Sequence, residues 1–296
     1  MIKKILITGG FGFIGSNAVR YFSNNFEIFV IDIFGKNIKN FIQGEVDIDN
    51  LKKFDTKFDY ILHFAGSGTV SSAQKSPEIE YAKSVLSLKH LLDYCVKQNN
   101  NAKIIFSSSA AVYGNKYDIP IKEDFELNPI SVYGKHKIEA ENLLKKYYEE
   151  YGIKSNIIRF FSIYGNGLKK QLLWDFSNRL KNIKDNKINC FGTGHEKRDF
   201  VHISDCLSLV DILINSNIDF GIFNGASGQE TEIDTMLRLL CKEYNINKEL
   251  LYDNIARDGD PFYLCADIGN AYELGFTPKV SVEAGIHKYA SWFKSN

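Results

Sequence analysis

Residues 4–15, KILITGGFGFIG, decide the fold of this chain. An apolar run from Lys4 to Thr8 predicts a buried strand. The glycines at positions 9, 12 and 15 then permit a tight turn, close approach of a bare backbone to a pyrophosphate, and close packing of the next helix on the strand. The amides and partial positive charge at the start of that helix favour an anion. The stretch therefore predicts a strand, loop and helix that bind phosphate groups.

A second predicted strand, 28–32, ends in Asp32. This is near the spacing of about 20 residues at which an acid meets the adenosine ribose of a dinucleotide. The glycine spacing is GxxGxxG rather than GxGxxG, so the prediction of a dinucleotide site depends on the surrounding elements and on Asp32. The alternative is an ordinary glycine-rich turn with a capping acid beyond it. A carboxylate repels a 2′-phosphate, which favours NAD, while the nearby Lys36 and Lys39 keep NADP as the alternative.

The first half of the chain alternates short apolar runs with longer segments of helical period, which is typical of parallel strands joined by crossover helices. Strands that are apolar throughout suit a sheet covered on both faces. The predicted strands are 4–8, 28–32, 60–64, 103–107 and 155–160, and the predicted helices are 15–23, 78–98 and 132–151. The fold class is therefore α/β, with a Rossmann-type doubly wound parallel sheet.

Past Phe161 the predicted elements become shorter and irregular, which indicates a smaller α/β substrate-binding domain toward the C-terminal side. We expect helices near 172–180, 204–215, 233–244 and 282–292, and strands near 188–191 and 221–224. The NAD-binding domain is predicted to comprise 1–161, with 201–225 returning to it, and the substrate domain 162–200 and 226–296.

The composition excludes several classes of protein. Among 296 residues, 36 basic side chains balance 36 acidic ones, so no overall field attracts nucleic acid or an anionic membrane. No apolar run approaches the roughly 18 residues of a membrane span, and the apolar part of MIKKILITGG is too short for a signal peptide. The scattered cysteines form no CxxC pair and the histidines no HExxH, so we expect neither disulfides nor a metal. These features predict a cytoplasmic protein.

Tyr133 and Lys137 stand one turn apart on one face of the predicted helix 132–151. A lysine ammonium there can lower the pKa of the phenol, especially beside an oxidised nicotinamide, and so provide a general base near neutral pH. A Tyr and a Lys four residues apart are common on helices without any function. The hydroxyls of Ser107–Ser109 favour the functional interpretation, because they end the preceding strand at the edge where open α/β sheets bind ligands.

Taken together, these motifs resemble the extended short-chain dehydrogenase/reductase family. Within it they are most similar to the NAD-dependent nucleotide-sugar epimerases and dehydratases, and nearest to the UDP-glucose 4-epimerase group. The matching segments, in family order, are TGGFGFIG (8–15), Asp32, Asp47-Ile48, HFAG (63–66), SSSAAVYG (107–114), YGKHK (133–137), RFFS (159–162), GTG to RDFVH (192–202) and RDGDP (257–261).

The resemblance implies roles for single residues. Ser109 would hydrogen-bond the reacting oxygen of the sugar, Tyr133 would be the base, and Lys137 would tune it and hold the nicotinamide ribose. The implied cofactor contacts are Gly9, Gly12, Phe13, Ile14, Gly15, Asp32, Asp47, Ile48, Phe64, Ala65, Gly66, Ser107, Tyr133, Lys137 and Phe160. The implied substrate contacts are Gly68, Ser109, Ser162, Phe191, Arg198, Arg257 and Asp260. The two arginines would clamp a diphosphate, for which guanidinium groups are suited, and Phe191 would border the nucleotide base.

Departures from the family pattern bear on the substrate. Ser84 and Ser162 stand where the nearest epimerases usually carry asparagine, and the 67–69 loop lacks their lysine, which weakens UDP-galactose as the specific substrate. Nucleotide-sugar dehydratases carry an Asp-Glu pair where this chain has Ala110 and Ala111. Without an acid to protonate the departing hydroxyl, dehydration is disfavoured.

The leading hypothesis is an NAD-dependent nucleotide-sugar 4-epimerase that works through a 4-keto intermediate. A 4-keto-sugar reductase or a C4 oxidase of deoxysugar biosynthesis would use the same residues, and a catalytically inactive NAD-sensing protein is a third alternative. The sequence leaves open which sugar is the substrate and whether its nucleotide is UDP, GDP, CDP or dTDP. The resemblance also implies a homodimer formed through helices 78–98 and 132–151.

Overall fold

The computed structural model describes residues 2–35, 38–66, 74, 76–99, 101–182, 186–255 and 261–296. The chain divides into two compact units. The first consists of Met1–Gly114, Glu126–Phe160 and Leu209–Phe223, and the second of Asn115–Phe125, Phe161–Ser208 and Asn224–Asn296.

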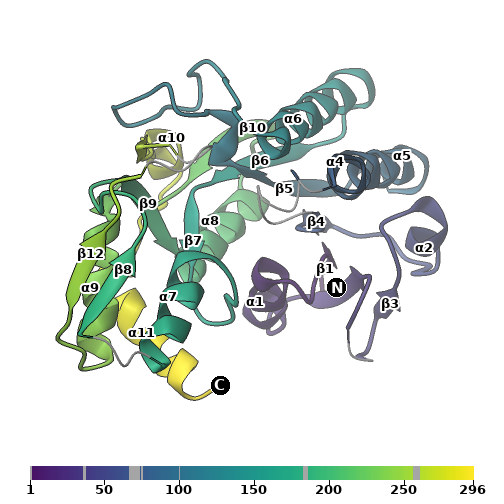
Figure 1. Ribbon diagram of the computed structural model, residues 1–296. Coiled ribbons are helices and arrows are strands. Elements are labelled where there is room, and N and C mark those ends of the chain that lie inside the picture. Colours follow the sequence, from purple (N-terminus) through teal and green to yellow (C-terminus); the bar gives the residue numbers. More distant parts are fainter. Residues whose placement is uncertain are drawn as a thin grey trace. The chain divides into compact units, whose positions relative to one another are not determined.

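The first unit is built on a seven-stranded sheet with the strand order β10-β6-β5-β4-β1-β2-β3 (Figure 1). Its strands are β1 (Lys4–Thr8), β2 (Glu27–Asp32), β3 (Phe41–Gln43), β4 (Tyr60–His63), β5 (Lys103–Ser109), β6 (Ser155–Phe160) and β10 (Phe220–Gly225). The strands from β1 to β6 pair in parallel, which confirms the predicted Rossmann-type α/β class. Because the pairs are parallel and in register, Thr8 lies beside His63, and His63 beside Phe106, at one edge of the sheet.

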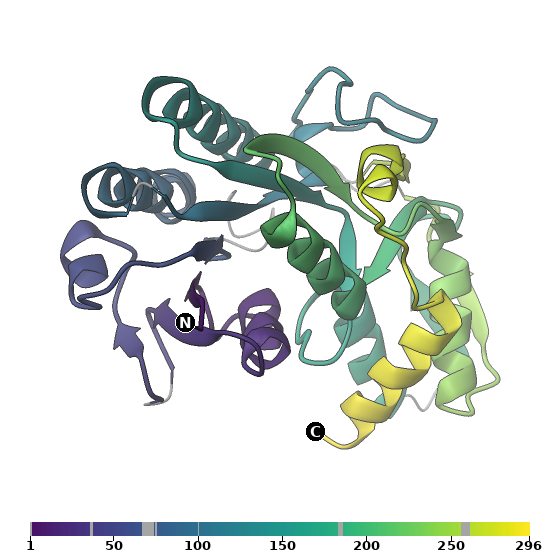
Figure 2. The same cartoon turned by 180° about the vertical axis from the view of Figure 1, so that it is seen from behind.

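Helices cover both faces of this sheet, as the unbroken apolar strands require. Figures 1 and 2 show α4, α5 and α6 on one face and α1 on the other. Successive strand residues point to opposite faces, so that Leu6, Ile61 and Ile104 share one core with the buried residues of α5 and α6. The helices that begin and end in this unit are α1 (Phe13–Phe22), α2 (Ile48–Lys52), α4 (Pro77–Tyr81), η1 (Ala82–Leu86), α5 (Ser87–Gln98), η2 (Ala110–Val112) and α6 (Val132–Tyr151).

Helix α6 has the predicted bounds because both of its ends are capped. The Ser131 hydroxyl accepts a hydrogen bond from the Gly134 amide at 3.1 Å, and Gly152 ends the helix in the left-handed conformation at φ 68°. The predicted helix 78–98 differs from the structure, since a π-helical turn, η1, separates α4 from α5. Apolar periodicity does not register the one extra residue of such a turn.

The second unit contains two small sheets. One joins β7 (Ser162–Tyr164), β9 (Lys197–His202), β11 (Glu230–Glu232) and β13 (Tyr263–Leu264), and the other joins β8 (Lys187–Cys190) and β12 (Glu249–Tyr252). The helices are α7 (Gln171–Lys181), α9 (Ile233–Glu243), α10 (Gly269–Glu273) and α11 (Val282–Lys294), while α8 (Ile203–Asn215) runs from this unit into the first. We did not predict β7, β9 and β11–β13, because they are short and several carry charged residues.

The segment Asn115–Phe125 groups with the second unit, whereas our predicted domain boundary placed it in the first. The Asn224 side-chain amide explains this grouping, since it donates to the Ile121 carbonyl at 2.8 Å and to the Asp267 carbonyl at 3.0 Å. Ile121 also forms a parallel bridge to Ala266. Ile121 lies more than 100 positions from both Asn224 and Ala266, so no local pattern predicts these contacts.

Candidate active site

The glycine loop between β1 and α1 has the geometry of an anion site. Gly9 adopts φ +68°, and the Gly12 amide donates to the Gly9 carbonyl at 3.0 Å. A Cβ at Gly9 would lie 2.8 Å from the Ala65 amide nitrogen, and a Cβ at Gly15 would overlap the Gly9 carbonyl oxygen. Gly12 caps α1 without any side-chain hydrogen bond, which leaves the amides of the first turn for a ligand. The loop therefore fits the pyrophosphate of a dinucleotide.

Asp32, at the end of β2, is buried and hydrogen-bonds the backbone of this loop. One carboxylate oxygen accepts from the Phe11 amide at 2.8 Å, and the other has a longer contact of 3.4 Å with the Phe34 amide. The second oxygen retains the capacity to accept from a ribose hydroxyl, so the predicted cofactor role and a structural role coexist. Asp47, predicted to contact adenine, caps α2 by accepting from the Asn50 amide at 2.7 Å.

The segment after β4 is held by His63, a residue whose role we did not predict. Thr8 Oγ1 lies 2.9 Å from His63 Nδ1 and accepts from the Ala65 amide at 3.1 Å. The imidazole stacks on the Phe106 ring, and burial lowers the pKa of His63 to about 3. The ring therefore stays neutral, and the Thr8 hydroxyl links it to the backbone by contacting Nδ1 and accepting from the Ala65 amide. Thr8 and His63 thus place Phe64–Gly66 beside the glycine loop.

Ser109, Tyr133 and Lys137 come together where β5 ends and α6 begins. The Ser109 hydroxyl accepts from the Ala111 amide at 3.2 Å and lies close enough to Tyr133 to lower the pKa of its phenol. Lys137 Nζ donates to the Ser107 carbonyl at 2.7 Å and lies 5.6 Å from the centroid of the Tyr133 ring. The three predicted catalytic residues therefore share one site, with the Lys137 ammonium beside the phenol.

Burial and nearby charges act on the pKa values of both Tyr133 and Lys137. Burial raises the pKa of Tyr133 to about 12, against a lowering by the Ser109 hydrogen bond, and the negative charge of Glu80 raises it further. Burial lowers the pKa of Lys137 to about 8, while Glu80 and Glu141 act in the opposite direction. The protein side chains alone therefore do not make Tyr133 acidic, and a lower pKa of Tyr133 beside an oxidised nicotinamide stays a prediction.

The predicted substrate residues that the structure describes, apart from Ser109, lie in the second unit. Arg198, on β9, donates to the Lys197 carbonyl at 2.9 Å, and the next residue, Asp199, is fully buried. The Asp199 carboxylate accepts from the Ser227 amide and hydroxyl, both at 2.7 Å, and from the Gly228 amide at 2.8 Å, which fixes the strand that carries Arg198. Ser162 begins β7 and pairs with Phe200 of β9. The remaining predicted positions, Gly68, Arg257 and Asp260, lie outside the described residues, as do Lys36 and the 67–69 loop.

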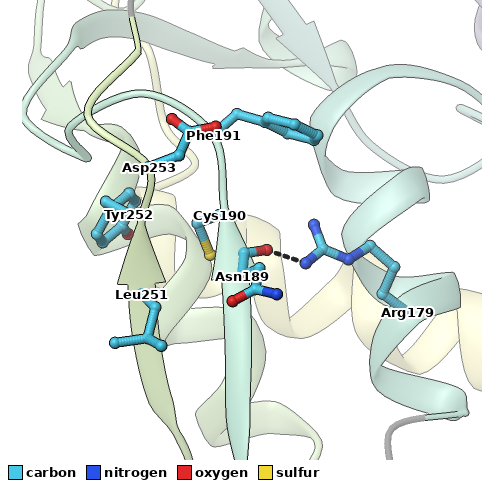
Figure 3. Close-up of a pocket in the computed structure, with 7 residues that line it drawn as sticks. All are labelled: Arg179, Asn189, Cys190, Phe191, Leu251, Tyr252 and Asp253. Atoms are coloured by element: carbon cyan, nitrogen blue, oxygen red, sulfur yellow. Dashed lines mark hydrogen bonds between the residues drawn. The ribbon is translucent and has the colours of Figure 1, made fainter.

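A pocket of about 540 Å³ lies at the β8–β12 pair beside α7 (Figure 3). Phe191, predicted to border the nucleotide base, is 60% exposed at its mouth. The Arg179 guanidinium donates to the Asn189 carbonyl across one side of it. The lining residues are Arg179, Asn189, Cys190, Phe191, Leu251, Tyr252 and Asp253. Apart from Phe191, we did not predict these residues from the sequence, because two strands far apart in the chain form the pocket together.

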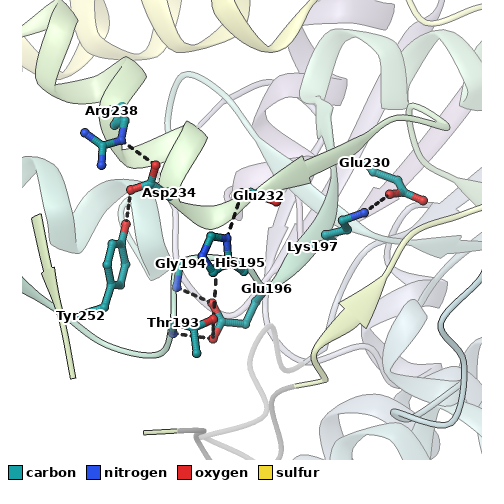
Figure 4. A network of polar contacts seen from close by, with 10 residues as sticks. All are labelled: Thr193, Gly194, His195, Glu196, Lys197, Glu230, Glu232, Asp234, Arg238 and Tyr252. Carbon is teal, nitrogen blue, oxygen red and sulfur yellow. Dashed lines mark hydrogen bonds and ion pairs between the residues drawn. The ribbon is translucent and has the colours of Figure 1, made fainter. Parts of the chain in front are cut away.

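Two carboxylates hold the turn and the tyrosine beside this pocket (Figure 4). Glu196 accepts from the Thr193 amide at 2.8 Å and from the Gly194 amide at 3.0 Å, which closes the GTG turn that follows Phe191. Asp234 accepts from the Tyr252 hydroxyl at 2.8 Å. These contacts hold the turn that follows Phe191 and the side chain of Tyr252, two residues that line the pocket.

Neither a metal site nor a membrane span emerges from the part of the chain that the structure describes. Within it no three His, Cys, Asp or Glu side chains are grouped so that they could hold a metal ion. None of its helices has the length and apolarity needed to cross a bilayer.

Comparisons with known proteins agree with this geometry. A putative UDP-glucose 4-epimerase of Methanocaldococcus jannaschii is 28% identical over 306 residues, with 99% of each chain covered. The solved UDP-N-acetylglucosamine 4-epimerase of Methanobrevibacter ruminantium M1, in complex with UDP-N-acetylmuramic acid, superposes with a TM-score of 0.89 at 26% identity, covering 99% of this chain and 98% of that one. The UDP-glucose 4-epimerase of Thermotoga maritima with UDP-glucose gives a TM-score of 0.88 at 26% identity, covering 99% of both chains.

The sequence model of one family spans most of the chain. It is described as the NAD dependent epimerase/dehydratase family, and it matches residues 5–224, from β1 to β10. The matched stretch includes the glycine loop, Asp32, Ser109, Tyr133 and Lys137. The chain therefore belongs to the NAD dependent epimerase/dehydratase family.

Proposed function

We propose that this protein is an NAD-dependent nucleotide-sugar 4-epimerase that works through a 4-keto intermediate. The observation that carries the proposal is the meeting of Ser109, Tyr133 and Lys137 at the end of β5, in the same unit as the glycine loop and Asp32. Open α/β sheets bind their ligands at this edge. When bound, NAD supplies the group that takes a hydride from the sugar carbon and returns it.

The residues of the chain hold and move the proton. Ser109 donates to or accepts from the sugar oxygen that reacts, and Tyr133 removes the hydroxyl proton from that oxygen. Because the pKa of Tyr133 is about 12 among the protein side chains, positive charge beside the phenol is needed for this step. Lys137 contributes such a charge, and so would an oxidised nicotinamide. The proton returns from Tyr133 when the opposite face of the ketone is reduced.

For the substrate we propose a UDP-sugar. The similar proteins of M. jannaschii, M. ruminantium and T. maritima are named as epimerases of UDP-sugars. The pocket at Phe191 has room for a pyrimidine base, and Arg198 would contact the diphosphate. We assign the first unit to NAD and the second to the substrate.

Substitution of Tyr133 tests the proposal directly. Tyr133→Phe should bind NAD as the wild type does but lose turnover of UDP-sugars by several orders of magnitude, because the base is gone. Tyr151→Phe, at the exposed end of the same helix, is the matched control and should keep its activity. Wild-type turnover in Tyr133→Phe would remove the proposed base.

The 4-keto-sugar reductase is the second candidate because it needs the same Ser109, Tyr133 and Lys137. The two differ in what happens to the cofactor. An epimerase keeps NAD bound through gel filtration and consumes no added NAD(P)H, whereas a reductase oxidises added NAD(P)H in proportion to product. Products and cofactor redox state should therefore be followed together over a panel of UDP-, GDP-, CDP- and dTDP-sugars.

We also propose that the protein is a cytoplasmic homodimer. Ile79 of α4 is 57% exposed and Leu86 of η1 is 39% exposed, so apolar side chains lie on the surface of the helices predicted to form the interface. Light scattering at micromolar concentration should give twice the mass of one chain. A monomer would contradict this part of the proposal.

A further inference from the structure

A buried carboxylate lies beside the catalytic helix and has no part in the proposed proton transfer. Glu80, on α4, is 2% exposed. The Ser84 hydroxyl of η1 donates to one of its oxygens, and the His136 ring of α6 contacts the other. Burial of a carboxylate is unfavourable unless its oxygens are paired, and here both are. Glu80 therefore joins α4, η1 and α6 through polar contacts.

The partners of Glu80 lie next to the residues proposed for catalysis. His136 precedes Lys137 and follows Tyr133 by three residues, so the imidazole lies on the same side of α6 as the phenol. Ser84 belongs to the π-helical turn, and its hydroxyl lies 3.4 Å from the position that a Cβ of Gly66 would take. A π-helical turn inside an α-helix is frequent at functional sites. Through its two partners Glu80 thus reaches both the segment after β4 and the start of α6.

The contacts around His136 fix its position as well. The Tyr81 ring meets the His136 ring edge-on at 5.2 Å, and the Tyr81 hydroxyl donates to exposed Glu139 at 2.6 Å. Among the described residues, the titratable groups of α6 that face Glu80 are Tyr133, His136 and Lys137. Glu139 accepts from Tyr81 instead, and Lys83 of η1 is exposed. The charge of Glu80 raises the pKa of both Tyr133 and Lys137.

We propose that Glu80 is a positioning residue for the Tyr133–Lys137 pair: its carboxylate holds His136 and Ser84 together and places a buried negative charge beside the face of α6 that carries both side chains. This inference rests on the proposed role of Tyr133 as the base. Glu80 would then have two effects. It links η1 to α6 through Ser84 and His136, and its charge favours the protonated forms of Tyr133 and Lys137.

The variant Glu80→Gln keeps the shape and the hydrogen-bonding capacity of the side chain but removes the charge. The pKa of Lys137 can be measured without any turnover, because its value of about 8 lies in a range where the protein can be titrated. NMR of ¹³Cε-labelled lysines, with Lys137 identified by its loss in Lys137→Met, should show the pKa of Lys137 falling by about one unit in Glu80→Gln. The acid limb of the pH profile of kcat/KM should move to lower pH in the same variant, since the pKa of Tyr133 falls too.

Glu139→Gln is the matched control, because it removes an exposed carboxylate that lies on α6 one turn beyond His136. It should leave the Lys137 titration unchanged to within about 0.2 unit, since solvent screens its charge. If Glu80→Gln does not fold, the double variant Glu80→Gln/His136→Gln supplies a neutral pair at the same place and should show the same fall. An unchanged Lys137 titration in the folded variant, or an equal fall in Glu139→Gln, would overturn the inference. Full turnover in Tyr133→Phe would instead refute the proposed function, whatever Lys137 does.

Discussion

Glu141 and Arg159 form a buried ion pair in which Nη2 of the guanidinium lies 2.8 Å from Oε2 of the carboxylate. Arg159 Nε lies within 3.2 Å of both carboxylate oxygens, and its Nη1 donates to the Tyr113 hydroxyl at 3.0 Å. The Ser108 hydroxyl donates to Glu141 at 2.5 Å. The pair therefore links α6, which carries Tyr133 and Lys137, to β6 and to the end of β5, next to Ser109.

Removal of Glu141 should destabilise the protein strongly. Glu141→Ala leaves the Arg159 guanidinium, which is 3% exposed, buried without its counter-ion, and we expect the free energy of unfolding to fall by about 3–5 kcal/mol. Urea denaturation followed by circular dichroism measures this fall. Glu149→Ala on the same helix breaks a solvent-exposed contact with Lys145, and the loss there should be at most about 1 kcal/mol. Equal losses in the two variants would contradict the importance given to the buried pair.

Acid should destabilise the protein through His63. The folded-state pKa is about 3, below the ordinary 6.5, so the unfolded chain binds a proton that the folded chain does not. The stability contributed by the neutral ring is fully present above about pH 6.5 and is lost as the pH falls toward 3, at up to about 1.4 kcal/mol per pH unit.

His63→Phe, which keeps a ring beside Phe106, should flatten the dependence of the denaturation midpoint on pH between about 6.5 and 4. His287→Gln is the comparison, since that imidazole is 68% exposed, and its curve should follow the wild type. A wild-type slope in His63→Phe would assign the acid lability to other groups.

Asp32 should set the preference for NAD over NADP. Asp32→Asn keeps an acceptor for the Phe11 amide but removes the charge that repels a 2′-phosphate. The affinity for NADP relative to NAD should rise about tenfold, measured by calorimetric titration of each cofactor. Asp49→Asn, on the exposed surface of α2, should leave the ratio unchanged. A preference that stays the same in Asp32→Asn would show that Asp32 serves only the glycine loop.

Ser109 should make Tyr133 a better base. Its hydrogen bond lowers the pKa of the phenol, so Ser109→Ala should shift the acid limb of kcat/KM to higher pH and lower kcat/KM at neutral pH by about 10- to 100-fold. Ser109→Thr retains the hydroxyl and should restore most of the activity. If Ser109→Ala loses activity without any shift of the profile, the hydroxyl acts on the sugar alone.

Local spacing was enough to predict the frame of the site. The apolar runs of β1 and β2, the glycines at positions 9, 12 and 15, and the capped helix that carries Tyr133 and Lys137 depend on neighbours within a few residues. The π-helical turn and the short strands of the second unit were missed, because neither changes the periodicity of the apolar residues enough to be seen.

The amino-acid sequence by itself determined that a parallel α/β sheet would place a glycine loop, an acid and a tyrosine–lysine pair along one edge, since periodicity and turn chemistry are local properties. Only the tertiary structure decided how these groups ionise. Burial among the protein side chains raises the pKa of Tyr133, an effect that local spacing does not contain. Folding brings Glu80 into contact with His136, 56 positions away in the sequence, and Glu141 into contact with Arg159, 18 positions away. The cost of desolvation depends on every group that excludes water, and those groups are neighbours only after folding.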